Sequence, residues 1–338
     1  MSRRRDGERP TLREVAERAG VSRGLASLAL RGVSGPSEKT REHVLAIAEQ
    51  LGYRPNSAAR ALALERSHLI GVTYHLRRPF DSDLVEELYD AAGKAGYELL
   101  LSGITASRPL RRAVETLVDG RCAGLVLLGV DTEESWLGTT EAMLPTVVIG
   151  RSDGRTSADV VRTAGDAGVR LAVEHLIELG HRRIVHVDGG DSPSAVERRD
   201  AYNATMAENR RAARTIPGGA GESDGAAAAA QLLRRGSGKL PTAIVAYNDS
   251  CAIGLMEEFR RAGVTVPGQV SVVGYDNSLP AQLDHLSLTT VAQDTALLAE
   301  LTVQRLVSRF EGDLAKPAES TLPPKLVVRA TTGPPRAA

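Results

Sequence analysis

The sequence predicts an all-α N-terminal headpiece followed by an α/β core of two doubly wound parallel-sheet lobes. Three observations support this fold class. Short capped helical segments fill residues 11–52, short apolar runs alternate with amphipathic helices from Leu69 onwards, and the charge divides between the two parts. Residues 1–66 hold 13 Lys and Arg against 8 Asp and Glu, whereas the remainder holds 29 against 34. A basic module on an acidic body suits a polyanion partner at one end only.

Composition narrows the class of protein. A hydrophobic fraction of 42% and a charged fraction of 25% are those of a soluble globular protein. Two cysteines are too few for a disulfide framework or a thiolate zinc site. No apolar run is long enough for a membrane span, and Met1–Asp6 lacks the apolar stretch of a secretory signal. We therefore expect a cytoplasmic protein with no cofactor, no metal site and no membrane partner.

The headpiece carries the local signals of three short helices. Thr11 and Glu14 have the spacing of a capping box, and apolar residues recur at helical spacing up to Ala19. Gly20 permits a left-handed turn, after which Ser22 can cap a second helix through Leu30. A loop over 32–36 precedes a third helix, capped by Ser37 and ended by Gly52. This pattern predicts a helix-turn-helix, with a generic three-helix bundle as the alternative.

The core alternates strands and helices in two series. Near-continuous apolar runs between helical stretches are typical of parallel sheets covered on both faces. Ligands of such folds bind beyond the carboxyl ends of the strands, so a cleft between two lobes is expected. The predicted strands are 69–72, 97–101, 124–128 and 145–149 in the first series, and 183–187, 243–246 and 270–274 in the second.

These motifs together resemble the lac-repressor (LacI/GalR-type) family of transcriptional regulators, whose core is periplasmic-binding-protein-like. The resemblance runs from Thr11 to about Pro335. It rests on Thr11–Ser22, Ser37–Arg41 and Leu51–Asn56 in the headpiece, and on Glu174–Ile184, Asn248-Asp249, Val270–Asp276 and Leu288–Val291 in the core. No long C-terminal heptad segment follows, so no coiled-coil tetramerisation tail is expected.

The resemblance implies a division of the chain into an arm, a headpiece, a hinge and a core. The expected parts are a flexible basic arm (1–10), the DNA-binding headpiece (11–55), a hinge helix or linker (56–66) and the effector-binding and dimerisation core (67–338). The core should divide into an N-lobe, about 67–163 and 295–322, and a C-lobe, about 164–292 and 323–335.

The second helix of such a headpiece lies in the major groove and reads bases from three positions, here Arg23, Gly24 and Leu28. The sequence departs from the family pattern, because Gly24 brings no side chain and Leu28 offers apolar contact only. Arg23 is the one evident guanine reader, the alternative being a solvated surface arginine. The other DNA-binding candidates, most of them phosphate contacts that fix register, are Thr11, Ser22, Ser27, Arg41, Tyr53, Asn56, Ala59 and Leu62.

The hinge is too short to be a stable helix alone. In the family it folds against its dimer mate in the minor groove, where a leucine wedges between base pairs, and by position that leucine is Leu62. A plain interdomain linker is the alternative. The resemblance therefore implies a homodimer on pseudo-palindromic operator DNA.

Effector contacts are expected at strand ends. Arg198, Asn248 and Asp276 match family positions that hydrogen-bond the effector, and a guanidinium with amide and carboxylate acceptors suits a sugar or related metabolite. Arg198 can also serve a structural ion pair, and Asn248-Asp249 can cap the following helix, which we expect of Asp249. Further candidates are His75, Phe80, Asp81, Gly150, Arg151 and Gln293, and Ala164 replaces an Asp common in the family.

The resemblance implies a sequence-specific DNA-binding regulator, a repressor, and two other functions compete with it. An enzyme is not expected, since the sequence has no nucleotide-binding glycine motif, nucleophile elbow or metal-ligand cluster. A two-lobed sugar-binding protein of the transport type is the alternative, but it would need a secretory signal and would carry no headpiece.

Overall fold

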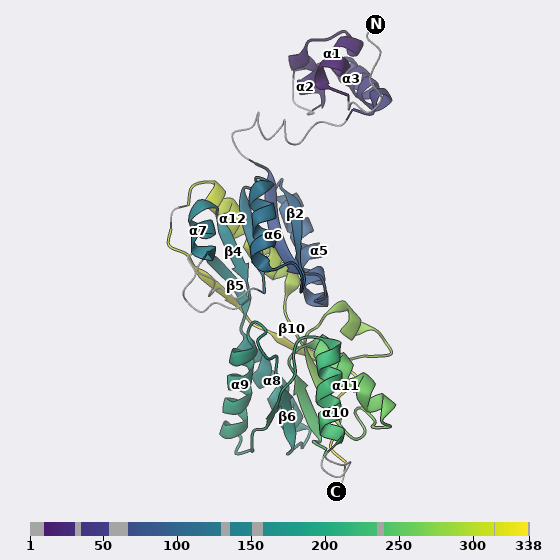
Figure 1. Cartoon of the computed structure of the whole chain (residues 1–338), viewed down its shortest axis with the longest axis vertical. Coiled ribbons are helices and arrows are strands. Elements are labelled where there is room, and N and C mark those ends of the chain that lie inside the picture. The colour runs from purple at the N-terminus through teal and green to yellow at the C-terminus, as the bar shows by residue number, and fades with distance from the viewer. Residues whose placement is uncertain are drawn as a thin grey trace. The chain divides into compact units, whose positions relative to one another are not determined.

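The computed structural model describes residues 10–30, 35–53, 67–129, 136–150, 158–234, 240–313 and 315–336. It divides into two units, Met1–Ser67 and His68–Ala338. Figure 1 shows the helices and strands of both units.

In the first unit the capping signals act as the sequence predicts. The described helices are α1 (Leu12–Ala19), α2 (Arg23–Leu30) and α3 (Glu38–Leu51). Thr11 and Glu14 form the capping box, and Ser37 caps α3 by accepting the Thr40 N–H. Gly20 and Gly52 end α1 and α3 at φ of 66° and 63°, a left-handed conformation that disfavours residues with a Cβ. The helices enclose a core of small side chains: Val15, Ala16, Ala19, Ala26, Ala29, Val44 and Ala48.

The N-lobe is a parallel sheet with helices on both faces. Its strand order is β11-β5-β4-β3-β1-β2. The strands are β1 (Leu69–His75), β2 (Glu98–Ile104), β3 (Gly124–Leu128), β4 (Thr146–Ile149), β5 (Asp159–Thr163) and β11 (Glu319–Leu322). Apolar clusters on the two faces join it to α5 (Pro79–Lys94) and α12 (Thr295–Phe310), and to α6 (Leu110–Asp119) and α7 (Leu137–Met143).

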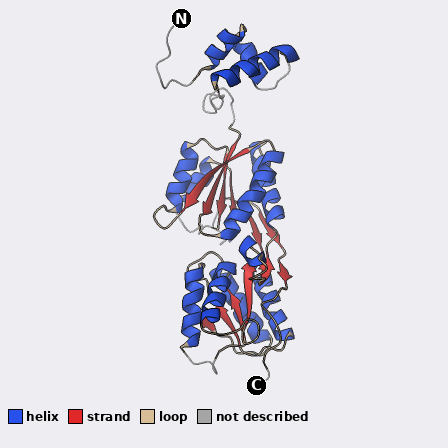
Figure 2. Ribbon diagram, turned by 90° about the vertical axis from the view of Figure 1, so that its right-hand side faces the viewer, coloured by secondary structure: helices blue, strands red, loops and turns tan. Residues whose placement is uncertain are grey.

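The C-lobe repeats this arrangement. Its strand order is β12-β10-β9-β8-β6-β7. The strands are β6 (Ile184–Val187), β7 (Thr215–Ile216), β8 (Ala243–Ala246), β9 (Ser271–Asp276), β10 (Thr289–Ala292) and β12 (Lys325–Val327). One face packs on α8 (Gly165–Glu178) and α9 (Ala195–Glu208), and the other on α10 (Glu222–Leu233) and α11 (Asp249–Arg261). A 3-10 helix, η2 (Leu279–Gln282), follows β9. Figure 2 shows helices on both sides of each core sheet.

The sequence predicts two parallel sheets, and the structure adds one antiparallel edge. β12 pairs antiparallel with β10, while the other strand pairs of the described core are parallel. The exception has a topological cause. β11 runs parallel to β5, so it ends at the edge of the N-lobe sheet that faces the C-lobe, and the chain continues from Leu322 to Lys325 directly into β12. β12 therefore enters the C-lobe sheet at the carboxyl end of β10 and runs in the opposite direction.

The described chain passes between the lobes at three places. β5 leads into α8 at Ala164, β10 leads into α12 at Gln293-Asp294, and β11 leads into β12 at Pro323-Pro324. The carboxyl ends of the central parallel strands of both lobes therefore face these crossings. This is the edge at which open α/β sheets bind ligands.

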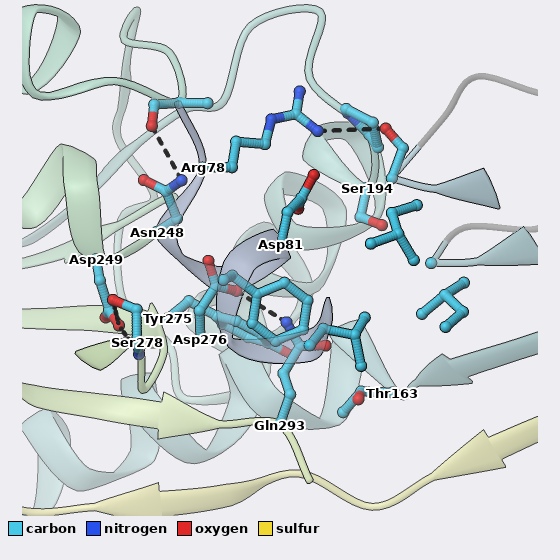
Figure 3. A pocket seen from close by; sticks show the side chains of 18 of the residues that line it. Arg78, Asp81, Thr163, Ser194, Asn248, Asp249, Tyr275, Asp276, Ser278 and Gln293 are labelled. Atoms are coloured by element: carbon cyan, nitrogen blue, oxygen red, sulfur yellow. Dashed lines mark hydrogen bonds between the residues drawn. The ribbon is translucent and has the colours of Figure 1, made fainter. Parts of the chain in front are cut away.

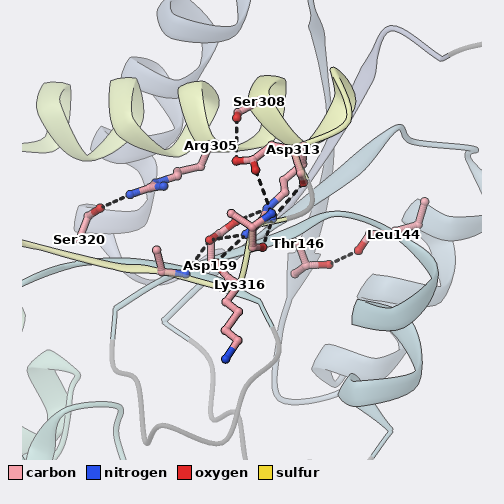
Figure 4. A network of polar contacts seen from close by, with 11 residues as sticks. Leu144, Thr146, Asp159, Arg305, Ser308, Asp313, Lys316 and Ser320 are labelled. Atoms are coloured by element: carbon pink, nitrogen blue, oxygen red, sulfur yellow. Dashed lines mark hydrogen bonds and ion pairs between the residues drawn. The ribbon is translucent and has the colours of Figure 1, made fainter.

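The opposite end of the N-lobe sheet is fastened by a buried ion pair. Asp159, at the start of β5, accepts hydrogen bonds from Arg309 Nε (2.8 Å) and Nη2 (3.0 Å) and from the Ala318 N–H (2.8 Å). Arg309 also donates to backbone carbonyls of Asp313 and Lys316. As Figure 4 shows, these contacts join β5 to the turn between α12 and β11.

Candidate functional site

A cavity lies between the two lobes of the core, where the strand ends predict a ligand site. It offers about 90 Å³ for the centres of water-sized molecules, several times the roughly 10–15 Å³ that one water needs. Side chains from both lobes line it, as Figure 3 shows. Of the predicted effector residues, those that line it are Phe80, Asp81, Arg198, Asn248, Asp276 and Gln293, together with Gly150.

Arg198 is the central cation of this cavity. Its guanidinium carbon lies 3.6 Å from the centre of the Tyr275 ring and 4.9 Å from that of Tyr247. Nη1 donates to the Tyr247 carbonyl at 2.6 Å, and Nη2 lies 3.7 Å from Asp276 Oδ1. Two aromatic faces and a backbone acceptor hold the guanidinium rigidly. Arg198 therefore both lines the cavity and takes part in the ion pair that the sequence left as an alternative.

Asp276 is buried beside Arg198 in an unusual backbone conformation. Its φ is 114°, and Asn277 follows at 56°, so two non-glycine residues in succession occupy the left-handed region. Gln293 Nε2 donates to Asp276 Oδ1 at 2.8 Å. Burial raises the pKa of Asp276 to about 7, although the nearby Arg198 opposes this shift. A carboxyl that is close to its protonation midpoint at neutral pH thus faces the cavity.

The capping role expected of Asp249 is taken by Asn248. Asn248, not Asp249, caps α11, because its Oδ1 accepts the Cys251 N–H at 2.9 Å while its Nδ2 donates to the Ala220 carbonyl. Asp249 accepts the Ser278 N–H and hydroxyl on one oxygen and the Thr290 hydroxyl on the other. Both residues line the cavity, yet their side chains are largely committed to holding the C-lobe together.

The prediction that His75 lines the cavity is not what the structure shows. His75 ends β1 and lies behind Asp81, whose Oδ2 accepts the His75 N–H at 2.8 Å and lies 3.1 Å from His75 Nδ1. Asp81 itself is buried in the first turn of α5 and reaches the cavity. The imidazole therefore orients a lining carboxylate instead of facing a ligand. Arg151 falls outside the described residues.

The lining residues that the sequence analysis did not name as ligand candidates include Arg78, Thr163, Ser194, Tyr247 and Tyr275. Tyr247 follows the end of a predicted strand and Tyr275 directly precedes Asp276, so the strand-end rule would have found both tyrosines had it been applied at each such position. Thr163 ends β5, a strand that the sequence analysis did not predict. Thr163 Oγ1, Arg198 Nε and Tyr275 Oη are buried and have no hydrogen-bond partner within the described chain.

In the headpiece the exposed start of α2 is the candidate DNA-reading surface. Arg23 and Gly24 occupy the first two positions of α2 and are exposed, and Gly24 has open space around its Cα. Ser22 is exposed and uses its Oγ to accept the Leu25 N–H at 3.1 Å. Leu28 and Ser27 are half-buried on the next turn.

The other DNA-binding candidates are distributed around this unit. Thr11 is exposed, with its hydroxyl in the capping box, and Arg41 is half-buried on α3. Tyr53 packs partly on the headpiece core, and burial raises the pKa of its phenol. The predicted DNA contacts Asn56, Ala59 and Leu62, and the predicted hinge 56–66, lie outside the described residues.

Neither a metal-ligand cluster nor a membrane-spanning helix is found in the described part of the chain. No group of three or more His, Cys, Asp or Glu side chains there is arranged to hold a metal ion. None of its helices combines the length and apolar character of a membrane span.

Comparison with known proteins gives a consistent result over both units. The model of "Bacterial regulatory proteins, lacI family" matches residues 11–56, and that of a "Periplasmic binding protein-like domain" matches residues 173–332. The lactose operon repressor of Escherichia coli (strain K12) is 32% identical over 333 residues, which cover 95% of this chain and 90% of that protein. The regulator CelR of Thermobifida fusca is 32% identical over 342 residues, with 97% and 99% covered.

Solved structures agree. A lacI-type transcriptional regulator from a Rhodococcus species is 40% identical, with a TM-score of 0.75 over 79% of this chain and 98% of that one. The lac repressor dimer bound to operator and the anti-inducer ONPF is 31% identical, with a TM-score of 0.81 over 96% of this chain and 100% of that one.

Proposed function

The chain belongs to the lacI family of bacterial regulatory proteins, and we propose that it is a repressor whose affinity for operator DNA is set by a small metabolite held between its core lobes. It is a transcriptional regulator with a DNA-binding helix-turn-helix and an effector-binding domain. The observation that carries the proposal is the cavity, because residues of both lobes line it. A ligand there contacts both lobes and can favour one closure state over another.

The proposal assigns a role to each part. Residues 11–55 bind DNA, 56–66 form the hinge and 67–338 bind the effector and the partner subunit. Arg23 reads a base edge, while Ser22, Ser27 and Arg41 contact phosphates. A homodimer on a pseudo-palindromic site follows from the small number of base pairs that one recognition helix reads, and it is supported by the similar lac repressor dimer on operator DNA. Because operator DNA is its target, we place the protein in the cytoplasm.

The effector proposed is a sugar or related metabolite. Related structures are of CelR with cellobiose and of an Enterococcus faecium regulator with ribose. In the present chain Arg198, Asp276, Gln293 and Asp81 offer the charged and amide groups that bind polar hydroxylated ligands. A transport-type binding protein shares this core but not the headpiece, and the relatives are regulators of transcription, not enzymes.

The test is selective capture of DNA. The full chain is incubated with fragmented genomic DNA of its host, and the retained fragments are sequenced at two salt concentrations. We expect a small set of fragments that share a pseudo-palindrome, with higher salt removing the background first. Retention of fragments in proportion to their abundance would rule out a sequence-specific regulator.

A further inference from the structure

One wall of the cavity is formed by the end of β5 and the beginning of α8. Thr163 is the last residue of β5, Ala164 is the N-cap of α8, and Gly165 is its first residue. Thr163 and Gly165 both line the cavity. Ala164 has no side-chain oxygen, and α8 has no side-chain cap. The first N–H groups of a helix lack intrahelical acceptors and carry a partial positive charge, so this end of a 14-residue helix favours an acceptor or anion.

The side chains around this wall lack acceptors in the same way. Thr163 Oγ1, Tyr275 Oη and Arg198 Nε are buried without a hydrogen-bond partner in the described chain. Thr163 and Arg198 are each 8% exposed and Tyr275 is 1% exposed, so bulk solvent hardly reaches them. Arg198 Nε can only donate, and the two hydroxyls can donate. In Figure 3, Thr163 and Tyr275 reach the cavity from different lobes.

Several acceptors of the cavity, in contrast, are occupied by the protein. Asp249 receives hydrogen bonds from Ser278 and Thr290 on both of its oxygens. Asp81 Oδ2 receives the His75 N–H, and Asn248 Oδ1 is used to cap α11. A ligand rich in acceptors would satisfy the donors that the protein leaves without a partner, Thr163 Oγ1, Tyr275 Oη and Arg198 Nε. A carboxylate or phosphate has this property, whereas each hydroxyl of a neutral sugar brings a donor with its acceptor.

One of the carboxyls that line the cavity is partly neutral at pH 7. Arg78 and Arg198 face the carboxyls of Asp81, Asp249 and Asp276, while Arg162 is paired with Glu197 and Glu319. Burial raises the pKa of Asp276 to about 7, which reduces the negative charge beside Arg198.

One further carboxylate lies close to the start of α8. A Cβ on Gly165 would be 2.9 Å from Glu197 Oε2, so Glu197 contacts this glycine. Its other oxygen lies 2.9 Å from Arg162 Nη1, in an ion pair that is largely shielded from solvent. The charge of Glu197 is therefore balanced locally, and Arg198 remains available to a ligand.

We propose that the ligand of this cavity is an acidic metabolite, a sugar acid or sugar phosphate, whose anionic group lies against the N-terminus of α8 and is bound by Thr163 Oγ1 and Arg198. The inference rests on the proposed function in that it names the chemical class of the effector.

The experiment compares matched pairs of neutral and acidic compounds. The unfolding temperature of the full chain is measured at about pH 7.5 and at constant ionic strength. At this pH the carboxylates and phosphates of the acidic compounds are ionised. The pairs are D-glucose with D-glucuronate, D-galactose with D-galacturonate, D-glucose with glucose 6-phosphate, and D-ribose with ribose 5-phosphate. We expect the acidic member of at least one pair to raise the unfolding temperature when its neutral partner does not. Whether the active compound carries a carboxylate or a phosphate identifies the kind of anion that the cavity binds.

Variants then locate the anion. Thr163→Val keeps the shape and removes the hydroxyl, and it should weaken binding of the active acid about tenfold or more. Thr163→Ser should restore most of that loss. Thr73→Val is the matched control, because Thr73 Oγ1 is also buried without a partner in the described chain but Thr73 does not line the cavity.

The inference is overturned if a neutral sugar raises the unfolding temperature as much as its acid, if no acid raises it, or if Thr163→Val binds the acid as the unaltered chain does. Capture of operator fragments, with and without the tested compounds, is measured separately. A chain that selects its pseudo-palindrome would remain a regulator, and only the class of effector would be wrong.

Discussion

Asp276→Asn should stabilise the free protein at alkaline pH while it removes a ligand contact. The folded chain raises the pKa of Asp276 from 3.8 to about 7 by burial, so the folded state holds this proton more tightly than the unfolded state does. The stabilising contribution of the group is therefore full below pH 3.8 and is lost as the pH rises through about 7. Asparagine, which does not ionise, avoids this loss.

The size of the effect follows from the two pKa values and from the partners of the carboxyl. A pKa difference of about 3 corresponds to about 4 kcal/mol in the free energy of unfolding at pH 8. The variant also removes the partner of Arg198, which keeps the Tyr247 carbonyl and two aromatic faces. The attraction to Arg198 is already included in the pKa of about 7, so it is not subtracted again and the gain at pH 8 stays about 4 kcal/mol at most. At pH 5, which is only slightly above 3.8, the gain should be less than half of that, about 2 kcal/mol or below.

The assay is urea unfolding of both proteins at pH 5, 6, 7 and 8, followed by circular dichroism and by fluorescence. Trp136 is the single tryptophan and packs against an N-lobe cluster, so its emission reports on the core. Other titrating groups are common to both proteins and cancel in the difference. Asp90→Asn, on the exposed face of α5, is the control for loss of a carboxylate. A difference between variant and parent that is the same at pH 5 and pH 8 would refute the reasoning.

Four other substitutions to alanine test separate parts of the molecule. Asp159→Ala leaves Arg309 without its buried partner and should lower the free energy of unfolding of the core by about 3 kcal/mol, measured by urea titration. Arg23→Ala should relax sequence preference, with a loss of about 1–3 kcal/mol of discrimination at one base pair, whereas Arg41→Ala should weaken binding to all sequences. Leu62→Ala, at a position outside the described residues, should weaken operator binding and leave ligand affinity intact. Gel-shift titrations against operator and random DNA measure the binding of the Arg23, Arg41 and Leu62 variants. Asp159→Asn, which keeps an acceptor for the Ala318 N–H, should cost less than Asp159→Ala. An alanine variant within about 1 kcal/mol of the parent would contradict the role of the pair. Equal losses on specific and random DNA would count against Arg23 as a base reader, and unchanged operator affinity would remove Leu62 from the hinge.

The sequence predicts those elements whose signals are local. Thr11 with Glu14, Gly20, Ser37 and Gly52 each lie within one helical turn of the group they cap, so their spacing alone locates the helix ends. The buried strands β3 and β8 appear as continuous apolar runs. The start of α5 has a weaker sequence signal, because the helix begins at Pro79, five residues before its apolar repeat starts at Leu84. Proline at the first helical position is the sign of that earlier start.

Edge strands were missed because their residues do not look buried. β11 reads Glu-Ser-Thr-Leu and pairs with β5 residues that lie 159 positions earlier in the chain, as Glu319 does with Val160. β12 and β7 have only 3 and 2 residues. β5 begins with Asp159, a residue depleted in strands. It is buried only because Arg309, 150 residues later in the chain, neutralises it. No residue near Asp159 in the sequence predicts that Arg309 is its partner.

The same limit applies to the site, and it explains what could be predicted there. The rule that ligands bind at strand ends placed Asp276 and Asn248 correctly at the cavity, since it needs only the strand. It failed for His75, because whether an imidazole faces a ligand or a neighbour depends on where Asp81 lies in three dimensions. The chemical class of the ligand depends further on which donors and acceptors remain unused. Asp249 is occupied because Ser278 and Thr290, which come from separate segments of the chain, donate hydrogen bonds to it. Arg198 donates from Nη1 to the Tyr247 carbonyl, whereas its Nε has no partner in the described chain. Residue identities therefore indicate a polar ligand, but the excess of donors that favours an acidic one exists only in the folded arrangement.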